Sequence, residues 1–170
     1  MTDNLTLYKL IILYMLNEVD FPLTTSQISE FVLDQGYTTY FKLQEALNDM
    51  VDSNLLIIES TYNRTLYHLT DEGSETIFVF RDRISPAIQN DVDEYLKEKH
   101  YDLKEEAGVK ANYYLNSKNG YVVRCQIVEN GVNLIDLKLV VPTETEAETI
   151  ASNWIRKNQQ LYTSLLTELL

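Results

Sequence analysis

Polar side chains gather at two places where they could contact a polyanion. The first is the start of a predicted helix, which carries hydroxyl, basic and amide groups: Thr38, Thr39, Lys42 and Gln44. Such side chains in the first turn of a helix can reach base edges or phosphates. The second is the turn of a predicted hairpin, where Arg64 could enter a minor groove or touch a phosphate, or could equally be an inert exposed cation. The chemistry indicated is non-covalent recognition of a nucleic acid.

Acidic residues oppose this interpretation. The same helix carries Glu45, Asp49 and Asp52, which would face phosphates if the helix lay in a groove. The chain has a formal net charge of −12. Residues 1–83 hold 5 basic and 13 acidic residues, a net charge of −8, and residues 84–170 hold 9 and 13, a net charge of −4. Both halves should repel a polyanion at long range, so a merely solvated helix face remains an equal alternative.

No pattern typical of a catalytic or cofactor site is present. Cys125 is the single cysteine, and His68 and His100 are far apart in the sequence, so no zinc cluster is expected. A phosphate-binding glycine loop, a serine elbow and an HExxH pattern are also missing. We therefore expect a protein that is not an enzyme and has no cofactor or metal, although a carboxylate-only site for a hard cation stays open. Cys125 is expected to be a buried core thiol.

Composition favours a cytoplasmic protein. The longest apolar run, residues 10–16, is too short to span a membrane, and Met1-Thr2-Asp3-Asn4 lacks the basic region of a secretory signal. One cysteine excludes an intramolecular disulfide, which fits a reducing compartment. The tyrosines of the second half could line a pocket for a planar ligand, but half-buried positions at sheet and helix edges are the preferred interpretation.

Periodicity predicts the order of elements in the first half. Apolar residues at three- and four-residue steps predict helices over about 5–19, from Thr24 or Thr25 to Gly36, and from Thr38 or Thr39 onward. Two short strands follow, at 55–58 and 66–69, and then another helix. Two helices leading into a β-ribbon is the order of a winged helix, so we expect a winged helix-turn-helix domain over residues 1–83.

The second half predicts a small antiparallel domain over residues 84–170. Ser85-Pro86 is suited to begin a helix. Alternating runs then predict strands at Val109–Ser117, Tyr121–Glu129 and Val132–Val141, joined by turns such as Asn130-Gly131. A capping box at 143–146 opens a long final helix. The predicted class is α+β, with the winged helix followed by an α-β-β-β-α domain that dimerises or senses an effector, whose identity the sequence does not give.

The predicted helices over about 5–19 and after residue 143 have apolar faces wider than packing against one neighbouring element requires. The surplus residues are expected to meet a second copy of the chain, because exposed apolar patches of this kind mark interfaces. The expected homodimer interface comprises Leu7, Leu10, Tyr14, Trp154, Leu161 and Leu165.

Residues 1–83 resemble winged-helix regulators of the MarR/PadR type. The residues that carry the resemblance are the run 23–28 and the segment 67–73, which is similar to a "Y-x-L-T-x-E-G" ending. The resemblance implies a DNA-contacting set of Ser26, Gln27, Thr38, Thr39, Lys42, Asn63 and Arg64. Taken whole, the chain also resembles a family of uncharacterised regulators from Gram-positive, clostridial-type bacteria, through residues 8–10, 84–88 and 140–143.

Two functions from different classes follow as expectations. The first is a homodimeric, DNA-binding transcriptional regulator that does not bind membranes. The second is an acidic winged-helix module that binds a basic protein partner and no DNA. Reversing the charge of Glu45 and Asp49 distinguishes the two.

Overall fold

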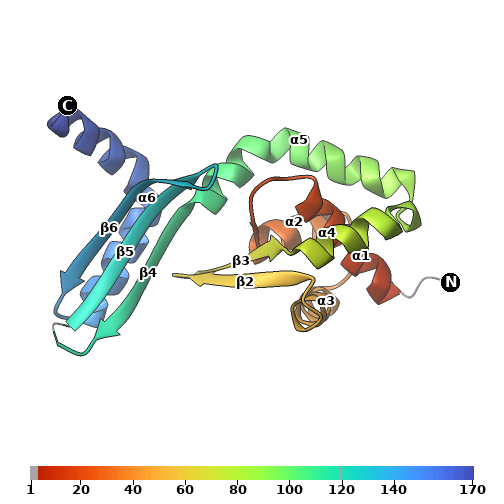
Figure 1. Cartoon of the computed structure of the whole chain (residues 1–170), viewed down its shortest axis with the longest axis horizontal. Helices are drawn as coiled ribbons and strands as arrows, with labels where there is room; N and C mark the ends of the chain where they lie inside the picture. The colour runs from red at the N-terminus through yellow and green to blue at the C-terminus, as the bar shows by residue number, and fades with distance from the viewer. Residues whose placement is uncertain (1–3, 119) are drawn as a thin grey trace. The chain divides into compact units, whose positions relative to one another are not determined.

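The computed structural model describes residues 4–118 and 120–170 (Figure 1). Within these residues, helices and two antiparallel three-stranded sheets form a mixed α+β fold. The chain divides into two compact units: residues up to 60 together with 64–107, and residues 61–63 together with 108–170. The first unit is mostly helical, and the second is rich in β-structure.

The first unit contains most of the helices. Its elements are α1 (Asn4–Asn17), β1 (Leu23–Thr24), α2 (Thr25–Asp34), α3 (Tyr40–Asp52), β2 (Leu56–Thr61), β3 (Arg64–Leu69), α4 (Asp71–Phe80), the 3-10 helix η1 (Arg81–Arg83) and α5 (Pro86–Gly108). The sheet order is β1-β3-β2, with Leu23 opposite Tyr67 and Thr24 opposite Leu66. The predicted hairpin is confirmed, but its strands are longer than expected and leave only two residues in the turn.

Hydroxyl side chains fix where three helices begin. Thr24 caps α2 and forms a capping box with Gln27, Thr39 caps α3, and Thr70 caps α4. A Cβ on Gly73 would clash with the Leu55 carbonyl oxygen, so the third residue of α4 must be glycine. The segment 67–73 therefore combines a strand, a helix cap and a close backbone approach.

Helix α1 is buried on every side along its second half. Residues 10–16 are each at most 4% exposed, including Leu10 and Tyr14, while Leu7 is partly buried against the same core. The Tyr14 hydroxyl donates a hydrogen bond of 2.8 Å to Asp93 in α5. The expectation that Leu10 and Tyr14 form a dimer interface is therefore wrong: the surplus apolar face of α1 is covered within the first unit.

Helix α5 belongs to the first unit, not the second. Its apolar face, with Val92, Leu96 and Leu103 buried, completes the core formed by α1 to α4. The Tyr37 hydroxyl donates to Asp91 at 2.6 Å, which ties the loop after α2 to α5. The compact units consequently divide at residues 107 and 108, whereas we expected a boundary between 83 and 84.

The second unit is a three-stranded meander covered by one long helix. Its elements are β4 (Val109–Asn116), β5 (Gly120–Glu129), β6 (Val132–Val141) and α6 (Glu144–Leu169), with strand order β4-β5-β6. The predicted strands are confirmed to within one residue, and Asn130 and Gly131 form their turn at φ values of 51° and 76°. Because α5 lies in the first unit, this unit is β-β-β-α rather than α-β-β-β-α.

One face of the meander forms the core of the second unit. Val123 and Cys125 are at most 1% exposed and pack with Ala147, Ala151 and Trp154 of α6. Burial raises the pKa of the Cys125 thiol to about 11, so the prediction of an inert core thiol is confirmed. Trp154 is 2% exposed, and its indole donates to a β5 carbonyl oxygen. It is therefore part of the monomer core and not of a dimer interface.

Candidate nucleic-acid interface

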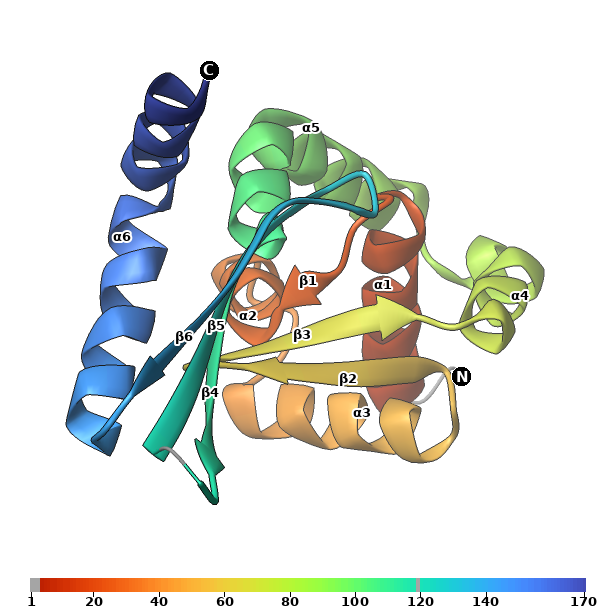
Figure 2. The same ribbon diagram turned by 60° about the vertical axis from the view of Figure 1, so that its left-hand side comes forward.

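Helix α3 runs alongside the hairpin of β2 and β3 (Figure 2), and residues 39–42 at its start are exposed. Its cap, Thr39, accepts a hydrogen bond of 3.4 Å from the Lys42 amide, and the Lys42 side chain extends from the same turn. Leu43 and Leu47 are fully buried and fix the opposite face of the helix. The geometry therefore presents the start of α3 outward, as its apolar periodicity predicted.

Two aromatic side chains in this turn were not among the expected site residues. Tyr40 is 59% exposed and Phe41 is 78% exposed. Both precede Leu43, the first buried residue of α3, so this turn lies outside the core. An aromatic pair beside Lys42 gives this surface both apolar and basic character.

The acidic residues of α3 are only partly compensated. Asp49 lies 3.0 Å from the ammonium of Lys9 in α1, so one of the three carboxylates has a cation beside it. Glu45 and Asp52 are exposed to solvent. Exposed ion pairs contribute little free energy, but the Lys9 contact reduces the negative charge that α3 presents.

The expected contacts in α2 have different positions. Ser26 is exposed in the first turn, whereas Gln27 is only 3% exposed. The Gln27 side chain accepts from the Thr24 amide at 2.9 Å and donates to the Leu103 carbonyl oxygen at 3.4 Å and to Glu106 at 2.9 Å. Gln27 thus joins α2 to the end of α5 and is not available as a surface contact. Its place in the capping box, three residues after Thr24, is a sequence signal for the bond to the Thr24 amide, but no local signal indicates the contacts with α5.

The hairpin turn also contains fewer free groups than expected. Arg64 is half-buried, and its guanidinium donates to the Glu106 carbonyl oxygen at 2.8 Å. Asn63 is exposed and has a φ of 53°, as a tight turn requires. Within the second unit, the Tyr62 amide donates to the Ala111 carbonyl oxygen at 2.5 Å. Thr38, before α3, is partly buried, and its hydroxyl oxygen has no hydrogen-bond partner among the described residues.

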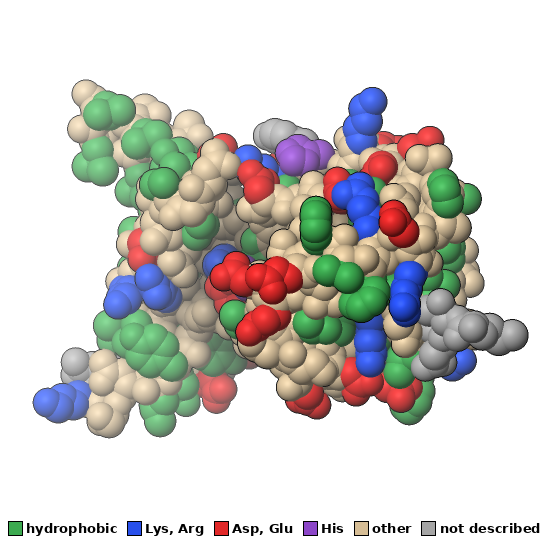
Figure 3. Space-filling view, turned by 45° about the vertical axis from the view of Figure 1, so that its right-hand side comes forward, with side chains coloured by type: hydrophobic (Ala, Val, Ile, Leu, Met, Phe, Trp, Pro, Cys, Tyr) green, Lys and Arg blue, Asp and Glu red, His purple; other side chains and the backbone are tan. Residues whose placement is uncertain are grey.

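Basic residues do not form a continuous surface in the view of Figure 3. Lys and Arg side chains are scattered there among Asp and Glu side chains. Of the seven residues expected to contact DNA, four are exposed: Ser26, Thr39, Lys42 and Asn63. The interface is therefore small and contains one free basic side chain, Lys42, in the turn that opens α3.

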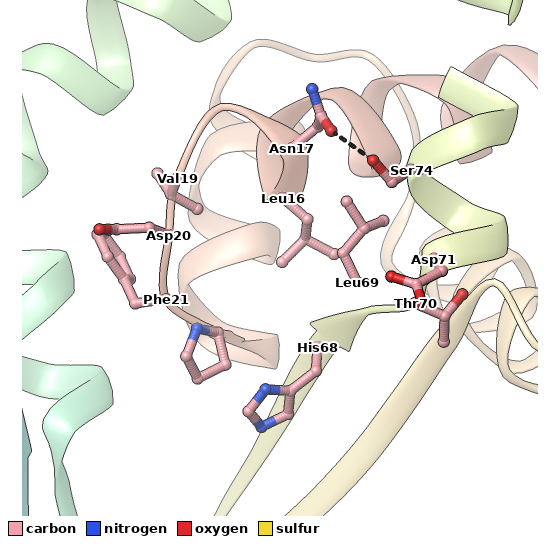
Figure 4. Close-up of a pocket in the computed structure, with 11 residues that line it drawn as sticks. Leu16, Asn17, Val19, Asp20, Phe21, His68, Leu69, Thr70, Asp71 and Ser74 are labelled. Carbon is pink, nitrogen blue, oxygen red and sulfur yellow. Dashed lines mark hydrogen bonds between the residues drawn. The ribbon is translucent and has the colours of Figure 1, made fainter. Parts of the chain in front are cut away.

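A polar groove of about 370 Å³ lies in the first unit beside the end of α1 (Figure 4). His68, Thr70 and Asp71 line one side of it, and Asp20 lies across from them. The His68 Nε2 is 2.7 Å from Glu59, so this imidazole already has a partner. Among the residues that the structure describes, no group of three His, Cys, Asp or Glu side chains could hold a metal ion.

Three tyrosines on the first unit should make its stability sensitive to high pH. Burial, followed by the hydrogen bond to Asp93, raises the pKa of Tyr14 to about 12. Burial also raises the pKa of Tyr37 and of Tyr95 above the ordinary value of 10.0, reinforced by neighbouring carboxylates. A raised pKa in the folded state means that stability is fully present below pH 10 and falls as the pH rises through 12, because the unfolded phenols ionise first.

A spectrophotometric titration of tyrosinate tests this expectation. Tyrosinate equivalent to three phenols should appear only together with unfolding, at or above about pH 12. The same titration in denaturant provides the control, since all phenols are then solvated. A folded protein in which every tyrosine ionises in one step near pH 10 would contradict the assigned hydrogen bonds.

The sequence as a whole belongs to a defined family. The geometry above describes a two-unit α+β protein with an exposed helix start. Residues 8–169 match the model of a family described as "Domain of unknown function (DUF4364)", and the chain belongs to that family. No curated protein and no solved structure matches it. The resemblance to an uncharacterised family is confirmed, whereas no family of winged-helix, MarR or PadR regulators matched.

One further property concerns membranes. Within residues 4–118 and 120–170, none of the helices combines the length and the apolarity needed to cross a bilayer.

Proposed function

We propose that the first unit is a winged helix and that the protein is a cytoplasmic, DNA-binding transcriptional regulator that acts as a homodimer. The observation that carries the proposal is the order of elements. A short strand, two capped helices and a hairpin follow α1, and the short strand completes the sheet β1-β3-β2. In helix-turn-helix proteins the second helix of such a pair enters the major groove, which gives that role to α3.

The contact surface under this proposal is the start of α3. Lys42 approaches a phosphate or a base edge, Thr39 and Thr38 lie beside it, and Ser26 contacts the backbone from α2. Gln27 and Arg64 hold α2 and the hairpin against α5 instead of touching DNA. With so few cations per subunit, binding relies on two copies engaging two half-sites.

A second candidate is an acidic module that binds a basic protein. The exposed rings of Tyr40 and Phe41 next to Glu45 favour it, because aromatic residues are enriched in protein interfaces and carboxylates would pair with partner cations. The net charge of −12 supports the same alternative.

Charge reversal on α3 separates the two candidates. Glu45→Lys with Asp52→Lys adds two cations to the exposed face of α3 and leaves the Lys9–Asp49 pair intact. Under the first candidate, DNA fragments selected from the genome should bind at least tenfold more tightly at low salt, with a steeper salt dependence. Under the second, capture of a basic partner should be lost.

The matched control makes the same change of net charge at exposed positions outside α3. Glu75→Lys with Glu94→Lys produces the same net charge on α4 and α5, where both residues are exposed. Equal gains in DNA affinity for both double variants would indicate a general charge effect and would exclude α3 from the DNA interface.

Lys42→Ala should weaken DNA binding and lower the slope of its salt dependence by about one, as loss of one phosphate contact does. A wild-type protein that selects no fragment even at low salt would defeat the DNA proposal.

A further inference from the structure

The second unit has a long open sheet edge. Strand β6 is ten residues long and pairs with β5 alone, and no strand within the described residues pairs with its outer side. Edge strands in monomeric proteins are usually short or protected by charges, proline or a covering element. On β6, exposed apolar side chains flank a single pair of charges, Asp136 and Lys138, and include Val132, Leu134, Leu139 and Val140.

The end of α6 provides a second apolar surface next to this edge. The helix packs mainly on β4 and β5, and its last buried residue is Asn158. In Figure 1 its final turns project past the sheet on the side where β6 forms the edge. Exposed leucines cover these turns, where Figure 3 shows hydrophobic side chains gathered: Leu161, Leu165, Leu166 and Leu169.

Charge favours a second copy of the chain as the occupant. At a net charge of −12, two copies repel each other except where charge is sparse. Glu168 is the single charged side chain between Gln159 and Leu170, so the projecting end of α6 is such a place. A leucine-rich, nearly uncharged surface beside an open strand is typical of homodimer interfaces.

We infer that two copies pair antiparallel through β6, with Leu137 opposite Leu137 of the second copy, and that the projecting end of each α6 covers the other copy's β6. This inference deepens the homodimer that the proposed function invokes. Antiparallel pairing of identical strands has its own two-fold axis, which closes the assembly at two copies. The result is a continuous six-stranded sheet.

Charge complementarity fixes this register. With Leu137 at the centre, Asp136 lies opposite Lys138 of the second copy, and this pair occurs twice. Leu134 lies at the β-bulge of β6, where the register with β5 shifts, and is therefore outside this regular pairing. Within one chain, Asp136 accepts two hydrogen bonds from the Arg124 guanidinium, at 2.9 and 2.7 Å, while Lys138 lies directly opposite Arg124 as a like-charge neighbour. A carboxylate from the second copy on the other side of Lys138 offsets that repulsion.

Sedimentation velocity over a concentration series tests the interface without DNA. The wild type should be a dimer at micromolar concentration, and Leu165→Glu with Leu169→Glu should raise the dimer dissociation constant at least tenfold. Gln160→Glu adds a carboxylate on the helix face that already carries Glu168, eight residues further on, and should have little effect. Val140→Lys should also weaken the dimer, whereas Leu115→Lys on β4, the opposite edge strand, should not.

A charge swap tests the register while preserving the fold. Lys138→Asp places two carboxylates opposite each other across the interface and should raise the dissociation constant at least tenfold. It also replaces the like-charged neighbours Lys138 and Arg124 within one chain by an aspartate opposite Arg124, beside the Arg124–Asp136 ion pair that is already present, so the thermal stability of the monomer should not fall. The double variant Asp136→Lys with Lys138→Asp restores opposite charges and should recover most of the affinity.

Cross-linking provides direct evidence for the central pair. Leu137→Cys should form an intermolecular disulfide under mild oxidation, because directly opposed residues have the Cα separation that a disulfide needs. Leu139→Cys should not form this disulfide, because the position-139 residues of the two chains would lie about 13 Å apart along the strands. The wild type, with its buried Cys125, is the control.

Several results would overturn the inference. A wild type that stays monomeric at all concentrations, or a Leu139→Cys variant that cross-links while Leu137→Cys does not, would each do so. A monomer that floats with phosphatidylcholine vesicles would assign the surface to lipid. A monomer that selects DNA fragments would contradict this dimer interface and leave the proposed DNA contact standing. A dimer that forms the Leu137→Cys cross-link but selects no DNA fragment would support the interface and contradict DNA binding.

Discussion

Trp154→Ala is expected to destabilise the second unit by about 3–5 kcal/mol, because a large-to-small change removes packing and leaves a cavity. The indole is 2% exposed and lies in a small core with Val123, Cys125 and Ala151. Its N–H donates to the Gln126 carbonyl oxygen at 3.2 Å, and that bond is lost as well. Since a domain is typically stable by about 5–15 kcal/mol, a loss of this size removes a large share of the total.

Hydrogen exchange can separate the two units in this experiment. Amides of β5 should lose protection in the Trp154→Ala variant, while amides of α1 keep theirs, because α1 belongs to a different core. Trp154→Phe retains most of the packing and gives up the indole N–H, so its loss should be about 1–2 kcal/mol. Unchanged protection of β5 in the alanine variant would show that α6 does not hold the sheet through this residue.

Local signals account for the part of the fold that the sequence predicted. Asn130-Gly131 specifies a tight hairpin turn by its tolerance of positive φ, and Thr143 caps α6 through the box it makes with Glu146. Each of these two signals spans at most four consecutive residues, and the alternation of β5 and β6 is equally local. For this reason the meander and the start of α6 could be predicted to within a residue.

The partner of an apolar helix face could not be predicted in the same way. Tyr14 and Asp93 are 79 residues apart, and only the folded chain brings α5 onto α1. A wide apolar stripe on a helix shows that a second partner exists, but burial by another helix and burial by another copy leave the same pattern. This is why Leu10 was expected in a dimer interface, and why the boundary between the units was placed before α5 instead of after it.

In the candidate site, the sequence could not show whether a polar side chain is buried or exposed. A glutamine in the first turn of a helix has the same sequence pattern whether it faces DNA or the interior. Gln27 faces the interior because α5 provides both a carbonyl oxygen, from Leu103, and a carboxylate, from Glu106. Lys42 is exposed on α3, as its position outside the apolar stripe predicted.

Gln27→Ala is therefore expected to lower the stability of the first unit by about 2–3 kcal/mol, because it leaves buried polar groups without partners. The variant removes the acceptor of the Thr24 amide and both hydrogen bonds to α5. Chemical denaturation monitored by circular dichroism measures the loss. Ser26→Ala, at the exposed neighbouring position, should change stability by less than about 0.5 kcal/mol.

Gln27→Glu separates the two roles of this side chain. The carboxylate still accepts from Thr24, so the capping box survives, but it now opposes Glu106 at hydrogen-bond distance. Two facing carboxylates raise each other's pKa, so the variant should be less stable than wild type at pH 7 and should recover as acidification protonates one of them. If Gln27 instead contacted DNA, both variants would change DNA affinity and leave unfolding unchanged. A loss of stability that is relieved at low pH can arise only from the buried contact between α2 and α5.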